Sequence, residues 1–485
     1  MPTAASPPDA IIPAPPLAAT ARLARLAAVV AVYCGIALLL PRPDALTPTA
    51  WRLFALFTAT VAGLMLEPIP QGALVLIAIT LTPVLGGISP GQALSGFGDP
   101  TVWLVMAAFF LSRALINTGL ARRIALFFVR LVGHNTVGVC YALSLSDLVL
   151  AGIIPSNGAR CGGVILPIAR SISELYGSRP GTSASLLGTY LYTAVYQSTC
   201  ISAAMFLTGQ ASNPLAAKMA GNAGFAITWM SWFLAGIVPG LLSLAIIPWI
   251  VMRISPPEIH RTPEARVFAR TELAAMGPLS RSEWIMAAVF VAVCGMWMTT
   301  SSHGLDTTQV ALLGTVALLL TGVLSWEDVR SEKAAWDLFI WYGGLVMLGK
   351  ALNDAKVPAE FARMISNQFG YLGWPLLFTI ALGIYYYAHY AFASITAHLL
   401  AMYPAFLAIL LAKGAPVGLV SFAFACFVCM SAGLTHYGTT PAPMFYGHGY
   451  VSFATWWRAG FIVSLANVAV WGTVGFAWWK VLGIW

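Results

Sequence analysis

Two short polar stretches interrupt long apolar segments of this sequence. The first, Pro155-Ser156-Asn157-Gly158, breaks an apolar region of about 121–172. The second, Ala393-Ser394-Ile395-Thr396, breaks a region of about 372–412. Each continues into Ala and a basic residue, Arg160 or His398, so both fit the pattern Ser-x-small-Ala-basic. The matched pattern suggests that the two regions have the same structural role.

Each interruption is expected to be the tip of a re-entrant helical hairpin. Lipid does not tolerate unpaired backbone polar groups, so such a tip must be buried in protein or line a wet cavity. The second helix of each hairpin begins at its tip, where free N–H groups and the positive dipole end attract an anion. Two tips facing one cavity suit the two carboxylates of a dicarboxylate. The alternative is a capped helix kink without a ligand, which a single tip favours and two matching tips disfavour.

The composition places much of the surface in lipid. Of the 485 residues, 59% are hydrophobic and only 9% are charged, whereas a soluble domain has about 25% charged residues. The net charge of +8 comes from dispersed basic residues, which is typical of cytoplasmic loops and not of a nucleic-acid interface. Among the seven cysteines, Cys426 and Cys429 lie in an apolar run, so packing is favoured over metal binding.

The remaining apolar segments predict membrane spans, each of which needs about 20 apolar residues. The expected spans are 24–40, 51–67, 72–87, 101–118, 185–208, 229–252, 284–300, 307–325, 336–352, 417–435 and 456–480. Together with the two hairpins they predict an all-α polytopic membrane protein with about eleven transmembrane helices.

A polar linker, 253–283, divides the chain into a first half, 24–252, and a second half, 284–485. The halves have a similar plan, and the span count predicts that they form an inverted repeat. Residues 1–23 are rich in Pro and Ala and are expected to be disordered. Positive charge at the N-terminus and in the linker predicts that both are cytoplasmic and that the C-terminus lies outside. The richness in Ala, Gly and Pro suggests a bacterial inner membrane.

The motifs together resemble those of the divalent anion:sodium symporter family. The stretch 155–164, from Pro155 to Val164, is similar to the first hairpin signature, and 202–208 with Asn213-Pro214 is similar to the motif that follows it. In the second half, His389-Tyr390, 394–398 and 434–443 resemble the counterparts. The similarity covers nearly the whole chain after residue 24. It is strongest to the branch of citrate/succinate and 2-oxoglutarate/malate antiporters.

The resemblance implies a homodimer in which each subunit has a fixed scaffold domain and a transport domain that moves as an elevator. It places substrate contacts on Ser156, Asn157, Gly158, Ser394, Ile395, Thr396, Thr440 and Pro441. A sodium site, where the family has one, would use Ser156, Asn157, Ser202 and Gly209.

Two departures from the family pattern affect these roles. Gly158 replaces the usual Thr, which removes one hydroxyl from the first tip. Ile395 replaces the Asn of sodium-coupled members, and its side chain has no oxygen for a hard cation. Arg160 and His398 are candidates for charge compensation. Arg160 either stabilises an anionic substrate, or pairs with Asp147 or a carbonyl and holds the shape of the hairpin, and the sequence does not decide between these roles. A structural role is favoured for Asp147, His436 and His448.

The sequence therefore predicts a secondary transporter that exchanges di- or tricarboxylates of the citrate, succinate, malate, 2-oxoglutarate or tartrate type. The alternative is a sodium-coupled dicarboxylate symporter. Sodium is not expected to be obligatory, and no other cofactor and no metal centre is expected. Small carboxylate anions and the lipid bilayer are the expected partners. An enzyme is disfavoured because the chain has no HExxH and no carboxylate pair within a span.

Overall fold

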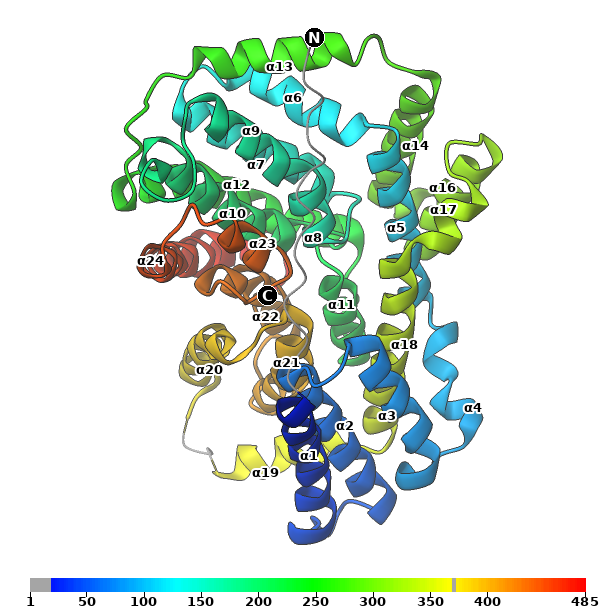
Figure 1. The fold of residues 1–485 in the computed structure, drawn as a ribbon. Coiled ribbons are helices and arrows are strands. Elements are labelled where there is room, and N and C mark those ends of the chain that lie inside the picture. Colours follow the sequence, from blue (N-terminus) through cyan, green and yellow to red (C-terminus); the bar gives the residue numbers. More distant parts are fainter. Residues whose placement is uncertain (1–18, 369–371) are drawn as a thin grey trace.

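The computed structural model describes residues 19–368 and 372–485, and the regular structure in this part of the chain is helical (Figure 1). The helices of the first half are α1 (Ala19–Cys34), α2 (Pro48–Leu66), α3 (Gln71–Gly86), α4 (Pro90–Ala93), α5 (Pro100–Asn117), α6 (Leu120–Val132), α7 (Thr136–Ala151), α8 (Asn157–Arg160), α9 (Leu166–Leu175), α10 (Gly188–Met205), α11 (Ser212–Asn222) and α12 (Trp229–Ile254). The remaining helices are α13 (Pro263–Ala275), α14 (Arg281–Met298), α15 (Thr300–His303), α16 (Thr307–Leu320), α17 (Trp326–Ser331), α18 (Lys333–Asp354), α19 (Val357–Gln368), α20 (Trp374–Ala388), α21 (Ile395–Ala412), α22 (Val417–Ser431), α23 (Pro441–Gly447), α24 (Phe453–Val470) and α25 (Phe476–Val481).

Eight helical segments in the described residues are long and apolar enough to cross a membrane. They are Ala19–Leu39, Pro48–Leu66, Pro100–Asn117, Trp229–Ile254, Arg281–Met298, Ile395–Ala412, Val417–Leu434 and Phe453–Val481. Seven of them overlap predicted spans, whereas Ile395–Ala412 is the second arm of a predicted hairpin. Two other predicted spans, 72–87 and 307–325, correspond to the shorter apolar helices α3 and α16. The all-α polytopic class is confirmed, and the total of eleven spans stays a prediction.

The first helix begins earlier than the sequence predicts. Helix α1 starts at Ala19, so residues 19–23 are helical and not disordered. The rest of the predicted disordered segment, 1–18, lies outside the described residues. Arg25 explains part of the difference, because its guanidinium donates to the Leu66 carbonyl at the end of α2 at 2.6 Å and holds α1 beside that helix. Its charge is therefore satisfied without ending the helix.

The apolar region predicted as one hairpin at 121–172 contains an extra helix before the hairpin. Helix α6 ends at Val132, and Asn135 then caps a new helix, α7, by accepting a hydrogen bond from Gly138 N at 2.7 Å. The basic residues of α6 face the linker helix α13, where Arg122 pairs with Glu272 at 2.6 Å. The first hairpin therefore consists of α7 and the helical run 157–175 (α8 to α9), and α6 is a separate amphipathic helix.

The two halves repeat one order of elements. In the first half α6 precedes the hairpin, and α10 and α11 follow it with a break between them. In the second half α19 precedes the hairpin of α20 and α21, and α22 and α23 follow it, again with a break. This correspondence is the one that the sequence predicts from its two interruptions.

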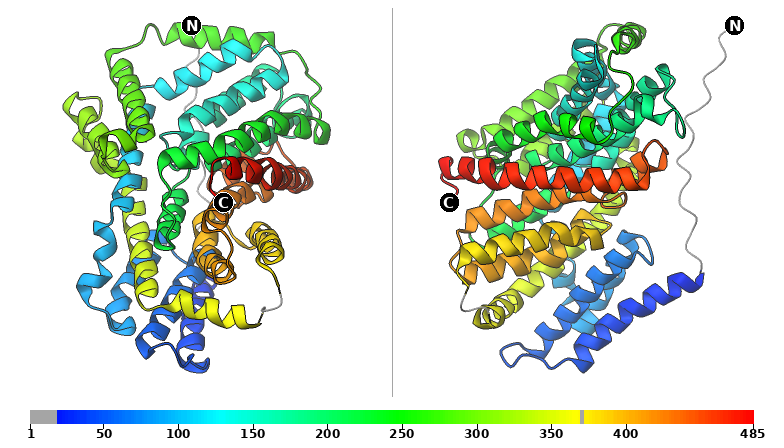
Figure 2. Two further views of the ribbon diagram at one scale, coloured as in Figure 1. Left: turned by 180° about the vertical axis from the view of Figure 1, so that it is seen from behind. Right: turned by 90° about the vertical axis from the view of Figure 1, so that its left-hand side faces the viewer.

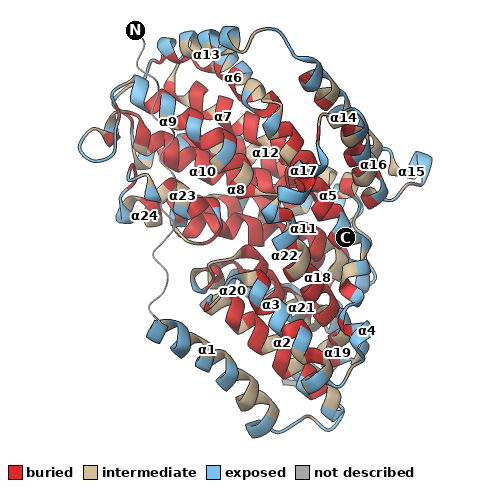
Figure 3. Ribbon diagram, turned by 45° about the vertical axis from the view of Figure 1, so that its right-hand side comes forward, coloured by how far each residue is buried: buried red, intermediate tan, exposed pale blue. Residues whose placement is uncertain are grey.

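The helices form two groups (Figures 1 and 2). The first contains both hairpins together with α10, α12, α22 and α24, and in it α10 packs on both α12 and α22. The second contains α2, α3, α5, α14, α16 and α18. Figure 3 shows that burial is deepest in the first group, where α10 and α22 are buried along most of their length. Both hairpins thus pack around the most buried helices of the molecule.

Candidate functional site

The first hairpin tip is a capped helix start. After α7 ends at Ala151, the chain is extended at Ser156, whose hydroxyl accepts a hydrogen bond from Ala159 N at 3.2 Å. Helix α8 begins at Asn157 and continues through a π-helical turn at Cys161–Ile165 into α9. The first N–H groups of a helix have no partners within it. Since Ser156 is partly exposed, the tip offers donors that a ligand can reach.

Arg160 is fully buried and fixes the shape of this tip. Its Nε donates to Asp147 Oδ1 at 2.9 Å, and its Nη1 donates to the carbonyls of Ile154 and Gly209 at 2.7 Å each. Of the two roles considered for Arg160, the structure contains the pairing with Asp147. The guanidinium therefore joins the tip to the chain segment around Gly209.

Arg160 also sets the orientation of the Asn157 amide. Its Nη2 donates to Asn157 Oδ1 at 2.7 Å, so the oxygen of the amide is occupied. Asn157 Nδ2 is buried and has no hydrogen-bond partner. A buried donor without a partner costs free energy of about 1–3 kcal/mol. An acceptor bound at the tip, such as a carboxylate oxygen, would remove this cost.

The second tip repeats the geometry of the first. Helix α20 ends at Ala388, and Ser394 caps α21 by accepting a hydrogen bond from Ala397 N at 3.4 Å. Ser394 is partly exposed, whereas Ile395 and Thr396 are buried. The apolar Ile395 side chain occupies the position that matches Asn157, so the second tip lacks the amide of the first.

A histidine pair replaces the Arg160–Asp147 pair at the second tip. His398 lies four residues after Ser394, as Arg160 does after Ser156, and its ring stacks between Tyr385 and Phe392 with centroid distances of 4.5 and 4.7 Å. Tyr385 lies nine residues before Ser394, as Asp147 does before Ser156. His398 Nδ1 lies 2.9 Å from His389 Nδ1. Both tips are therefore supported from beneath by a basic side chain, with different partners.

The hydrogen bonds of His389 define the protonation of the pair. His389 Nε2 is 2.9 Å from the Gly438 carbonyl, and a carbonyl accepts only, so Nε2 carries a proton. A neutral His389 then accepts at Nδ1 from the Nδ1–H of His398. The contact holds one proton between the two rings, because two N–H groups cannot face each other at this distance. His398 is fully buried beneath the tip, between Tyr385 and Phe392.

Polar side chains bond to the backbone of each break. In the first half, Thr208 donates to the Gly152 carbonyl at 2.6 Å, and Asn213 Nδ2 donates to the carbonyls of Ala203 and Phe206 at 2.8 Å each. In the second half, Gln197 donates from α10 to the Gly433 carbonyl at 2.9 Å. These bonds satisfy backbone groups that the two breaks leave free.

The segment 437–440 contacts both hairpins, at the tip of the first and just before the tip of the second. A Cβ atom on Gly158 would lie 3.0 Å from Thr440 Cγ2, so the first tip touches Thr440 closely. On the other side, Tyr437 donates its hydroxyl hydrogen to the Tyr390 carbonyl at 2.8 Å, next to the His389–Gly438 contact. The two hairpins, which are more than 200 residues apart in sequence, are thus brought to one place.

The predicted site residues differ in their accessibility. Thr440 is exposed and Ser156 and Ser394 are partly exposed, whereas Pro441 is buried as the first residue of α23. Ser202 is buried and donates to the Ser198 carbonyl of its own helix at 3.2 Å. Of the four predicted sodium ligands, Gly209 has its carbonyl occupied by Arg160. His436 and His448 are partly buried and contact Trp457 and Tyr192, in line with the structural role favoured for them.

Four polar residues hold the two breaks together, namely Gln197, Thr208, Asn213 and His389. Gln197 was not singled out from the sequence, and the other three were quoted there as motif residues without a role. A usable signal was present, because polar side chains inside otherwise apolar segments are costly and have a purpose in most cases. Within the described ranges, no cluster of three or more His, Cys, Asp or Glu residues is suited to hold a metal ion.

Comparison with known proteins agrees with this architecture. The family model described as "Sodium:sulfate symporter transmembrane region" matches residues 20–485. The chain is 44% identical to the "Putative malate transporter YflS" of Bacillus subtilis, over 92% of this chain and 94% of the relative. It is 40% identical to "Dicarboxylate transporter 1, chloroplastic" of Arabidopsis thaliana, over 92% of this chain and 81% of that relative.

A solved structure has the same overall fold at low sequence identity. The Alcanivorax borkumensis YdaH transporter, described as having an unusual topology, aligns with a TM-score of 0.51 and 15% identity. The alignment covers 84% of this chain and 89% of that chain. The match to the model of the sodium:sulfate symporter transmembrane region covers nearly the whole chain. This protein is therefore a multi-pass membrane transporter and belongs to the divalent anion:sodium symporter family.

Proposed function

We propose that this protein exchanges one dicarboxylate for another across a bacterial inner membrane. The observation that carries the proposal is that the segment 437–440 contacts both hairpins, at Gly158 in the first tip and at His389 and Tyr390 just before the second tip. Each tip is a capped helix start, Asn157 Nδ2 is an unpartnered donor at the first tip, and neither tip has an acidic side chain. A dianion with two separated carboxylates matches two such helix starts. The printed names of the relatives, which refer to malate and dicarboxylates, agree with this class of substrate.

Each carboxylate would be bound by one tip. At the first tip the donors are the free N–H groups of α8, the Ser156 hydroxyl and Asn157 Nδ2. At the second they are the N–H groups of α21 and the hydroxyls of Ser394 and Thr396. Thr440 is exposed between the tips and would contact the middle of the substrate. Charge-assisted bonds of this kind are about twice as strong as bonds between neutral groups.

Exchange without obligatory sodium is supported by the backbone carbonyls near the tips and breaks, which already have side-chain partners. Arg160 donates to the carbonyls of Ile154 and Gly209, and His389 contacts the carbonyl of Gly438. Carbonyl oxygens of this kind are the ligands that a hard cation would need. A bound ion can leave with the substrate, whereas a side chain stays. These carbonyls therefore have protein partners that stay in place when the substrate leaves, which supports transport without obligatory sodium.

The movement would be of the elevator type in a homodimer. Both hairpins and the breaks belong to the helix group around α10 and α22, which would carry the substrate as one transport domain. The group that contains α2, α3, α5 and α18 would be the scaffold. The N-terminus and the linker 253–283 would be cytoplasmic, and the C-terminus would lie outside.

A transport assay with purified protein tests the coupling. Proteoliposomes loaded with unlabelled malate or succinate are expected to take up labelled dicarboxylate equally fast in choline and in sodium buffer. Liposomes without internal dicarboxylate are expected to take up little label in either buffer. Uptake that needs external sodium, and that internal dicarboxylate does not stimulate, would instead establish a sodium symporter.

A further inference from the structure

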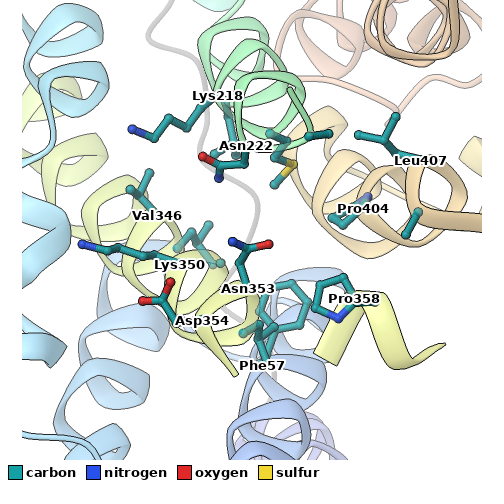
Figure 4. Close-up of a pocket in the computed structure, with 18 of the residues that line it drawn as sticks. Phe57, Lys218, Asn222, Val346, Lys350, Asn353, Asp354, Pro358, Pro404 and Leu407 are labelled. Atoms are coloured by element: carbon teal, nitrogen blue, oxygen red, sulfur yellow. The ribbon is translucent and has the colours of Figure 1, made fainter. Parts of the chain in front are cut away.

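A large cavity lies away from the hairpin tips, between the two helix groups. Its volume is about 810 Å³, and α11 and α21 form one side while α2, α18 and α19 form the other (Figure 4). Neither Ser156, Ser394 nor Thr440 lines it. The cavity is therefore separate from the site proposed for the dicarboxylate. Its volume is in the range of about 300–1,000 Å³ that is typical of sites for organic ligands.

The walls of this cavity are suited to a hydrocarbon chain. Aliphatic and aromatic side chains from four helices line it, among them Phe57, Leu215, Val346 and Leu407. A small dicarboxylate would leave most of this apolar surface in contact with water, at a cost of about 25 cal/mol per Å². An acyl chain would cover it.

The polar residues of the cavity are suited to an anionic headgroup. In Figure 4, Lys218 and Lys350 extend towards the same side, while Asn222 and Asn353 project into the space from opposite helices. The lining has three basic residues, Lys218, Lys350 and Arg363, and two acidic ones, Asp99 and Asp354, so its net charge is +1.

The two acidic residues do not offset the attraction of the basic residues for an anion equally. Asp99 is occupied, because it pairs with Lys218 at 3.0 Å and accepts from Thr101 N at 2.9 Å at the start of α5. Arg363 is occupied as well, because it pairs with Glu360 at 2.6 Å. Lys350 is the basic residue of the lining for which the described part of the chain shows no ion pair, so its ammonium is the group that remains to meet an anion. Basic pockets between transmembrane helices are recognised sites for anionic lipid headgroups.

We propose that this cavity binds one anionic phospholipid, with an acyl chain between the helix groups and its phosphate near Lys350 and Asn353. Only the expected effect of the lipid on exchange rests on the proposed function. Because α11 and α21 would move against α2, α18 and α19 in an elevator motion, a lipid wedged between them would slow exchange. Lipid binding itself does not depend on that motion.

Native mass spectrometry of the purified full chain with added phosphatidylglycerol tests the site. The wild type is expected to retain one phosphatidylglycerol per subunit. Lys350→Ala is expected to weaken its binding by about tenfold or more, as for one lost hydrogen bond to a charged group. Leu407→Trp is expected to weaken it as well, because the larger side chain fills the space of the acyl chain. Lys333→Ala is the matched control, because Lys333 is exposed at the opposite end of α18 and outside the cavity. Its lipid binding is expected to be unchanged.

Two further measurements separate this proposal from the proposed function. Thermal unfolding of each variant identifies a loss of binding that is due to misfolding, and Lys350→Ala is expected to melt as the wild type does because Lys350 is exposed. Wild-type lipid occupancy in both variants, or displacement of the lipid by succinate, would overturn the lipid site. Failure of dicarboxylate exchange in liposomes would overturn the proposed function and leave the lipid measurement standing.

Discussion

Replacing Gly158 with Ala tests directly whether the first hairpin tip touches the second break. The new Cβ would lie 3.0 Å from Thr440 Cγ2, closer than van der Waals contact, so one of the two groups must move. Overpacking of this kind costs about 1–3 kcal/mol. Gly158 is also the second residue of α8, where Ala favours the helix over Gly by about 0.5–1 kcal/mol. The net expectation is a destabilisation of up to about 2.5 kcal/mol.

The sign of this effect should reverse when the methyl group of Thr440 is removed. Thr440→Ser keeps the hydroxyl and deletes Cγ2, so Gly158→Ala in this background should keep its helix gain without the clash. It is then expected to stabilise the protein by about 0.5–1 kcal/mol. The matched control is Gly163→Ala, because a Cβ there would meet Ile116 Cδ1 at an ordinary 3.8 Å.

Thermal unfolding of the four proteins of this cycle, followed by tryptophan fluorescence, gives the coupling between the two positions. The expected coupling is about 1–3 kcal/mol, the range for residues in contact. A Gly158→Ala variant that is equally stable in both backgrounds would refute the contact. The first tip would then not contact the segment 437–440. Succinate affinity, measured by calorimetry on the same proteins, is expected to fall in Gly158→Ala and to recover in the double variant.

Three other variants test different parts of the site. Asn157→Ala is expected to weaken dicarboxylate binding about tenfold to a hundredfold, because a donor to a charged group is lost; calorimetry that gave wild-type affinity would move the substrate elsewhere. Asp147→Asn leaves Arg160 buried without its counter-charge and should destabilise the protein by about 3–5 kcal/mol in thermal unfolding; an unchanged melting temperature would contradict the buried pair. Lys218→Met breaks the partly exposed ion pair with Asp99 that joins α11 to α5. Since such a pair contributes up to about 1 kcal/mol, the exchange rate should change by up to about fivefold while the substrate affinity stays the same. An altered affinity with an unaltered rate would speak against a contact between moving parts.

The sequence determined the membrane class, the family and the position of both hairpin tips. A chain with so few charged residues and such long apolar segments must place much of its surface in lipid. The interruptions at Ser156 and Ser394 are recognisable because polar residues within such segments are rare. These features depend on neighbours in the sequence, so the sequence was sufficient to predict them.

Only the tertiary structure decided what the buried polar groups bond to. The sequence did not decide whether Arg160 contacts the substrate or pairs with Asp147. Its position depends on Asp147 in α7 and also on the carbonyl of Gly209, 49 residues away. The sequence did not show that α6 is separate from the first hairpin. An amphipathic helix packed on α13 and one helix of a re-entrant hairpin are both largely apolar. The contact between Gly158 and Thr440 joins residues 282 positions apart. No periodicity or local preference records such a contact, because packing between distant segments is settled only when the whole chain has folded.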